Sequence, residues 1–218
     1  MATSQDGDRI GDLMAAEQWE NARALIETKL HEDPGNHWLL TQLGETYYEQ
    51  REYKKALGVL LRSRDILPDC PLTLWHLAGT LDALGEHAGA MRLYSWLLRS
   101  TKTPKDDPCW ESVEWTEALK TDCVFRMGLC FKHLNRNELA SYCFRKYISI
   151  FSQGAEGSYP IEEARKYLQE AHLSRRKAVE QEFQEAVAWA LTTSGEEALP
   201  ASEPPELDRQ GLELLQEA

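Results

Sequence analysis

The chain repeats at an interval of 34 residues, which is most visible in three alanines, Ala22, Ala56 and Ala90. The same step separates three further sets: Trp19, Tyr53 and His87; Leu13, Tyr47 and Leu81; Pro34 and Pro68. A helix of a dozen residues is about 18 Å long, so two such helices and two short turns account for the interval. Units of this kind bury their apolar faces only against neighbouring units. The sequence therefore predicts an all-α stack of helix pairs whose function lies on its surface.

Three of the four repeats carry a small residue near the middle of the first half, and all four carry an alanine in the second half. The motif positions are Leu43, Gly44, Tyr47, Tyr53, Ala56, Leu60 and Pro68 in 37–70; Leu77, Ala78, Leu81, Gly85, Ala90 and Tyr94 in 71–104; Met127, Gly128, Phe131, Ala140 and Phe144 in 121–154; and Leu13, Trp19, Ala22, Ile26 and Pro34 in 3–36. The last of these is the most divergent, because Ile10 stands where a small residue is expected. These motifs resemble the tetratricopeptide repeat (TPR) family. The resemblance implies a right-handed α-α superhelix, a TPR solenoid, closed by a C-terminal capping helix.

The predicted domain organisation follows from where the repeat keeps and loses its register. Four units (3–36, 37–70, 71–104 and 121–154) form a domain over 3–154, with an insertion at 105–120, a capping helix within 155–192 and an acidic tail at 193–218. Ala90 and Ala140 are 50 residues apart, which is one period plus the length of the insertion. The tail is rich in Gly, Pro, Ser and Glu, a composition typical of disorder.

The repeat register also predicts individual helices. Their expected ranges are 8–16, 19–32, 37–50, 53–66, 71–84, 87–100, 137–151 and 160–191. Asp107 and Pro108 suit a helix start, so 108–134 is expected to be either one lengthened helix or an added helix leading into the fourth unit.

Composition excludes several functional classes. A net charge of −12 over 218 residues would repel the phosphates of nucleic acids. No apolar run is long enough for a membrane span, and the first dozen residues lack the apolar core of an export signal. The five cysteines are an odd number in helical contexts, so reduced thiols and a cytoplasmic location are expected.

No motif of an enzyme or of a cofactor site is found, including P-loop, nucleophile-elbow, HExxH and dinucleotide-glycine patterns. Cys123, Cys130, His133 and Cys143 lie within one repeat, yet they contain no Cys-x-x-Cys pair, and buried cysteine commonly serves as a small apolar residue. We therefore expect a non-catalytic chain without a cofactor or metal.

In TPR stacks the first helices of the units line the inner, concave surface, so the resemblance identifies candidate groove residues. They are Trp38, Thr41, Glu45, Tyr48, Glu49, Trp75, Asp82, Phe125 and Lys132. Aromatic side chains are common hot spots of interfaces, and carboxylates favour basic groups. We expect a protein or peptide partner that offers apolar anchors and basic residues. The two-cation clamp of chaperone-binding TPR proteins is absent, because Gly7, Gly11, Gln42, Leu72 and His76 occupy its positions.

Three functions remain open. The first is an adaptor or scaffold that binds a partner peptide or helix in the groove or through the Trp110 and Trp115 insertion. The second is a client-holding chaperone similar to the small acidic TPR chaperones of bacterial secretion systems. The third is a structural subunit that self-associates, for example as a homodimer, through the long helix at 160–191.

Overall fold

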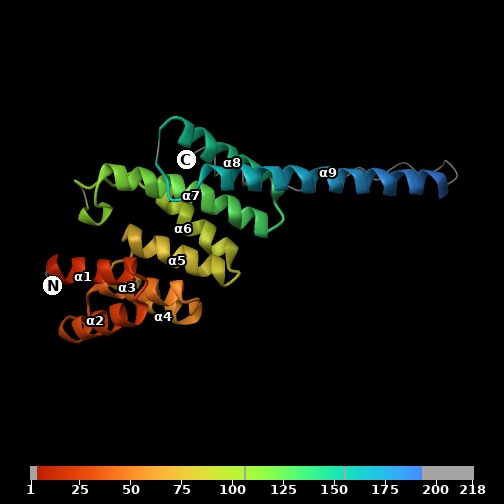
Figure 1. The fold of residues 1–218 in the computed structure, drawn as a ribbon. Helices are drawn as coiled ribbons and strands as arrows, with labels where there is room; N and C mark the ends of the chain where they lie inside the picture. The colour runs from red at the N-terminus through yellow and green to blue at the C-terminus, as the bar shows by residue number, and fades with distance from the viewer. Residues whose placement is uncertain (1–3, 106, 155, 193–218) are drawn as a thin grey trace. The chain divides into compact units, whose positions relative to one another are not determined.

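The computed structural model describes residues 4–105, 107–154 and 156–192, and every regular element within them is helical (Figure 1). The elements are α1 (Ser4–Ala15), α2 (Trp19–Glu32), α3 (His37–Glu49), α4 (Tyr53–Ile66), α5 (Pro71–Ala83), α6 (His87–Arg99), the 3-10 helix η1 (Pro108–Trp110), α7 (Val113–His133), α8 (Asn137–Ser152) and α9 (Ile161–Thr192). The chain divides into two compact units, up to Thr116 and from Glu117 onward. The acidic tail predicted at 193–218 lies outside the described residues.

The first unit consists of three helix pairs, α1–α2, α3–α4 and α5–α6, followed by η1. Neighbouring pairs contact each other through α2 with α3 and α4 with α5, and the first helices α3 and α5 also contact each other directly. Contacts between helix pairs that are neighbours in sequence are the arrangement that the 34-residue period predicts. As a consequence, α3 and α5 present one continuous surface.

The periodic alanines occupy the sites of closest helix approach. Ala22, Ala56, Ala90 and, in the second unit, Ala140 are fully buried. The small residue of the first helix has the same role: a Cβ added at Gly44 would lie 2.6 Å from Leu60 of α4. The backbones can approach because these positions lack bulk, and larger side chains such as Leu60 fill the space between them.

The turn inside each pair adopts the same backbone conformation. One residue in each turn has a positive φ: Glu17 (55°), Arg51 (61°), Gly85 (86°) and Asn135 (58°). In each case the next residue's N–H donates to the carbonyl five residues before it, as Glu52 does to Tyr47 and Glu86 to Leu81, both at about 2.8–2.9 Å. This is the Schellman motif, which ends a helix with one left-handed residue. The first three positions are 34 residues apart, so the repeat extends to the turn geometry.

The second unit contains most of α7 together with α8 and α9. Phe125 of α7 is fully buried; its ring stacks on Tyr159 at 4.2 Å and meets Phe144 of α8 edge-on at 5.6 Å. A Cβ at Gly128 would lie 2.8 Å from Phe144. The motif pair of a small residue on the first helix and a large one on the second is therefore present in α7 and α8 as well.

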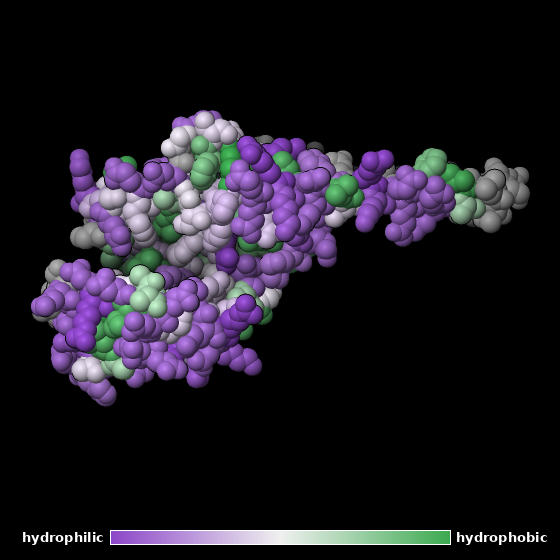
Figure 2. Space-filling model, viewed as in Figure 1, coloured by the Kyte–Doolittle hydropathy of each residue, from purple (hydrophilic) through white to green (hydrophobic). Residues whose placement is uncertain are grey.

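Only the first part of α9 is buried. It packs along α8 through Ala164 and Ala171, whereas Leu173, Phe183 and Val187 are exposed. Apolar groups accordingly stand among hydrophilic ones along the outer part of this helix (Figure 2). Among the described residues, no helix has the length and apolarity needed to cross a membrane.

The insertion takes the form of a loop, a short 3-10 helix and the first turn of α7. Glu111, with a φ of 47°, interrupts the helical path between η1 and α7, so the first of the two predicted alternatives, one lengthened helix over 108–134, is wrong in its first five residues, and the short helix η1 precedes α7 instead. Trp110 is fully buried, and Thr116 Oγ1 donates to its carbonyl at 3.1 Å. The buried indole of Trp110 thus anchors the loop. Of the two tryptophans of the insertion, only the half-buried Trp115 is partly accessible to solvent.

Candidate functional site

Five of the seven predicted groove residues of the first unit, Trp38, Glu45, Tyr48, Glu49 and Trp75, are accessible on the surface formed by α3 and α5. We call this the α3–α5 surface and define it by the residues that are partly or fully accessible there: Trp38, Glu45, Tyr48, Glu49, Trp75 and His76. Because α3 and α5 contact each other, these side chains lie on neighbouring helices. The surface therefore combines three aromatic rings with two carboxylates.

The two tryptophans are each half-buried. Trp38 packs on the core cluster that contains Ile10, Leu39 and Leu43, and its ring lies 3.7 Å from where a Cβ of Gly7 would stand. Trp75 meets Tyr94 of α6 edge-on, with ring centroids 5.5 Å apart. Both rings are thus held in place by packing while part of each stays accessible. A fixed aromatic ring offers contact area without a large loss of side-chain entropy.

The carboxylates form an acidic pair on α3. Glu45 Oε2 lies 3.3 Å from Nε2 of His76, which joins α3 to α5. Desolvation raises the pKa of Glu49, and the neighbouring charge of Glu45 raises it further, although the Glu49 side chain remains exposed. A cation placed between Glu45 and Glu49 would relieve this repulsion. This part of the surface is therefore acidic, with His76 as the neighbouring basic side chain.

Two predicted groove residues of the first unit point inward instead. Thr41 is fully buried, and its Oγ1 lies 2.9 Å from Ser63 Oγ and 2.7 Å from Thr73 Oγ1. Asp82 is 7 % exposed, and its Oδ1 lies 2.7 Å from Nδ1 of His87. Buried polar groups persist in a protein interior because they are hydrogen-bonded. In this structure both side chains stabilise the packing.

The remaining two predicted residues belong to the second unit and are described there alone. Phe125 is fully buried in the aromatic cluster with Tyr159 and Phe144. Lys132 is half-buried; its Nζ lies 2.7 Å from Glu170 Oε2 and 4.3 Å from the ring centre of Tyr167. Lys132 thus ties α7 to α9.

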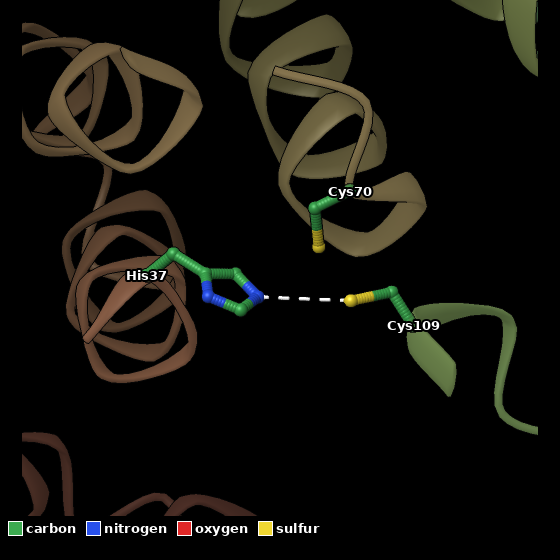
Figure 3. A group of neighbouring side chains, drawn as sticks. All are labelled: His37, Cys70 and Cys109. Atoms are coloured by element: carbon green, nitrogen blue, oxygen red, sulfur yellow. Dashed lines mark hydrogen bonds between the residues drawn. The ribbon is translucent and has the colours of Figure 1, made fainter. Parts of the chain in front are cut away.

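A second feature of the first unit escaped the sequence motifs. The donor atoms of His37, Cys70 and Cys109 all lie within 4.8 Å of one another (Figure 3). They come from the start of α3, the residue before α5, and η1. Burial lowers the pKa of His37 and thereby favours the neutral imidazole, while burial and the nearby Cys70 and Asp107 raise the pKa of Cys109 to about 12. The donors are 33 and 39 residues apart, too far for a short metal-binding pattern to reveal them.

Comparison with known proteins identifies the repeat. The family model described as tetratricopeptide repeat matches residues 13–72, and no curated protein shows a significant match. A crystal structure of MamA protein superposes with a TM-score of 0.51 at 19% identity, covering 91% of this chain and 97% of that one. A second MamA structure, MamA AMB-1, superposes with a TM-score of 0.54 at 16% identity, and the match covers 87% of this chain and 92% of that one. A crystal structure of a putative kinesin light chain from Podosopora anserina, with nearly identical TPR-like repeats, superposes with a TM-score of 0.58 at 13% identity. The match covers 87% of this chain and 96% of that one. The predicted fold class, an all-α solenoid of helix pairs, is confirmed.

Proposed function

We propose that this chain, whose residues 13–72 match the tetratricopeptide repeat model, is a non-catalytic protein-interaction adaptor. Its binding site would be the α3–α5 surface, and its ligand a peptide or helix of a partner protein. The partner would insert apolar side chains beside Trp38 and Trp75 and place a lysine or arginine against Glu45 and Glu49. All five cysteines lie among the described residues and none of them forms a disulfide, which supports a reducing compartment such as the cytoplasm.

The observation that carries this proposal is the coexistence of packed aromatic rings and an acidic pair on two adjacent helices. Trp75 is held by Tyr94 at 5.5 Å, so its exposed edge needs no ordering when a partner binds. The pKa of Glu49 is raised, partly by the charge of Glu45, so a basic group gains interaction energy when it neutralises the pair. Apolar anchors next to a complementary charge are typical of interaction hot spots.

The test compares what the intact chain and its variants retain from the native cell extract, with proteins quantified by mass spectrometry. The double variant Glu45→Lys/Glu49→Lys should lose the specific partner, and Trp75→Ala should weaken its retention by about 10-fold or more. Glu27→Lys, an exposed charge reversal on α2, is the matched control and should retain it. A partner retained equally by all four proteins would overturn the assignment to this surface.

A second measurement on the captured partner separates an adaptor from a chaperone. A chaperone's client should become insoluble in cells that lack this chain, whereas an adaptor's partner should stay in solution. Solubility of the captured partner, measured in a deletion strain, therefore decides between the two.

A self-associating subunit is the second candidate, because one observation favours it. Leu173, Phe183 and Val187 are exposed on the outer part of α9, and pairing with a second α9 would remove these apolar groups from water. Sedimentation of the full chain should then show a concentration-dependent dimer that Phe183→Glu abolishes. A monomer at every concentration would exclude this candidate.

A further inference from the structure

We propose that His37, Cys70 and Cys109 form a zinc-binding site with two thiolate ligands and one imidazole ligand. The site lies entirely in the first unit, and it is separate from the acidic pair and aromatic rings of the α3–α5 surface.

The donor geometry is close to that of a bound ion. Nε2 of His37 and Sγ of Cys109 are 3.7 Å apart, and no pair among the three donor atoms is further apart than 4.8 Å (Figure 3). In a tetrahedral zinc site with the usual bond lengths of 2.0 to 2.3 Å, neighbouring ligand atoms are about 3.3 to 3.8 Å apart. The imidazole and the Cys109 thiol already meet this spacing. Cys70 Sγ lies within 4.8 Å of both other donor atoms, so an approach of about 1 Å or less brings it to the same spacing.

The repeat itself brings the first two donors together. His37 is the first residue of α3, and Cys70 immediately precedes α5 and its Pro71, so the two hold nearly equivalent positions in successive units. Asn36 caps α3 by accepting the N–H of Leu39 at 3.1 Å. Below the donors, Ser63 Oγ donates to the His37 carbonyl at 2.8 Å and lies 3.1 Å from Thr73 Oγ1 of α5. These bonds hold the starts of α3 and α5 in fixed relation.

The insertion supplies the third donor and is tied to the same place. Lys102 pairs with Asp69, the neighbour of Cys70, and its Nζ also lies 3.4 Å from Asp107 Oδ2. Asp107 Oδ1 in turn accepts the N–H of Cys109 at 2.9 Å. The next residue, Trp110, is fully buried and anchors the 3-10 helix. A salt bridge, a backbone hydrogen bond and a buried ring therefore all direct Cys109 toward Cys70.

The donor set selects the metal. Thiolate and imidazole ligands suit zinc, whereas magnesium and calcium require oxygen ligands, of which the three-residue set has none. Three protein ligands leave the fourth tetrahedral position to water or to a partner's side chain.

The test uses the purified full-length chain, stripped with a chelator under reducing conditions and titrated with Co²⁺, whose tetrahedral thiolate complexes absorb visible light. We expect one Co²⁺ per chain, displaced by one Zn²⁺, together with a zinc-dependent rise in Tm. Cys70→Ser, Cys109→Ser and His37→Ala should each weaken binding by more than about 10-fold. Cys143→Ser, a buried cysteine of the second unit, is the matched control and should bind as the parent does.

Cys109→Ser is the decisive variant, because Cys109 is half-buried in a three-residue helix and its loss should leave the circular dichroism spectrum unchanged. Unaltered cobalt binding by a folded Cys109→Ser chain would overturn the proposal. So would the absence of a stoichiometric cobalt complex in the parent. A Cys70–Cys109 disulfide found in chain alkylated directly in cells would also overturn it, since the two thiols would then be a redox pair.

Discussion

Gly44 of α3 lies directly against Leu60 of α4, so that a Cβ at Gly44 would stand 2.6 Å from both Cγ and Cδ2 of the leucine. Alanine at this position would therefore force the two helices apart or distort the Leu60 side chain. We expect Gly44→Ala to lower the free energy of unfolding by about 1–3 kcal/mol, as measured by urea denaturation.

Gly58 of α4 provides the control for that substitution. It is exposed, and a Cβ there would meet no atom within 4 Å. Because alanine is the better helix former, Gly58→Ala should raise stability by about 0.5–1 kcal/mol. If both substitutions raise stability, helix propensity and not close packing governs these positions.

The left-handed turn residues allow a second prediction. Arg51 adopts a φ of 61°, which disfavours any residue with a Cβ, whereas Gly85 holds the equivalent turn position at 86°. Arg51→Gly should stabilise the chain by about 0.5–1 kcal/mol, and Gly85→Ala should destabilise it by about 1 kcal/mol. Thermal unfolding of the two variants checks this prediction. A Tm shift of the same sign in both variants would contradict the shared turn geometry.

The buried hydroxyl cluster of Thr41, Ser63 and Thr73 supports a third prediction. Thr41→Val keeps the shape of the side chain but removes the bonds of 2.9 Å to Ser63 and 2.7 Å to Thr73. We expect a loss of about 1–2 kcal/mol in the free energy of unfolding. Thr28→Val, at an exposed hydroxyl on α2, should change stability by less than about 0.5 kcal/mol. Similar losses in both variants would show that burial of the cluster is immaterial.

The burial of Asp122 predicts that the stability of the folded chain depends on pH. Burial raises the pKa of this carboxyl, against the opposing effect of the two bonds that it accepts from the Ser158 N–H. A raised pKa means that the folded chain binds the proton more tightly than the unfolded chain does. Stability contributed by this group is therefore greatest at low pH and declines as the pH rises through the folded-state pKa.

Asp122→Asn removes the titration and should stabilise the chain more at pH 7 than at pH 4. Urea unfolding of parent and variant over this range measures the difference, with the exposed Asp12→Asn as control. A difference that stays constant with pH would contradict the proposed desolvation.

Helix positions were largely predictable, because the period of 34 reports which residues must be small. The expected ranges 19–32 and 53–66 coincide with α2 and α4. The insertion was less predictable, since it follows no period: the interruption at Glu111 and the burial of Trp110 depend on tertiary contacts.

The candidate site was predictable in part for the same reason. Repeat position indicates which side of a helix a residue occupies, and Trp75 and Glu45 are accessible as that implies. Repeat position does not show whether a polar side chain finds a hydrogen-bond partner, so the burial of Thr41 was missed. The convergence of His37 with Cys109 joins residues 72 apart, and no local pattern reports it.

The hydroxyl cluster has one further consequence, which concerns how the repeats can be exchanged. Its three oxygen atoms contact each other only when α4 and α5 meet α3 in one alignment; a slip by one turn would break these three buried contacts. The second helix pair (α3–α4) and the third (α5–α6) are therefore matched to each other. In chimaeras assembled from shuffled units, replacing either of these two pairs alone should break the hydroxyl contacts between them and lower stability.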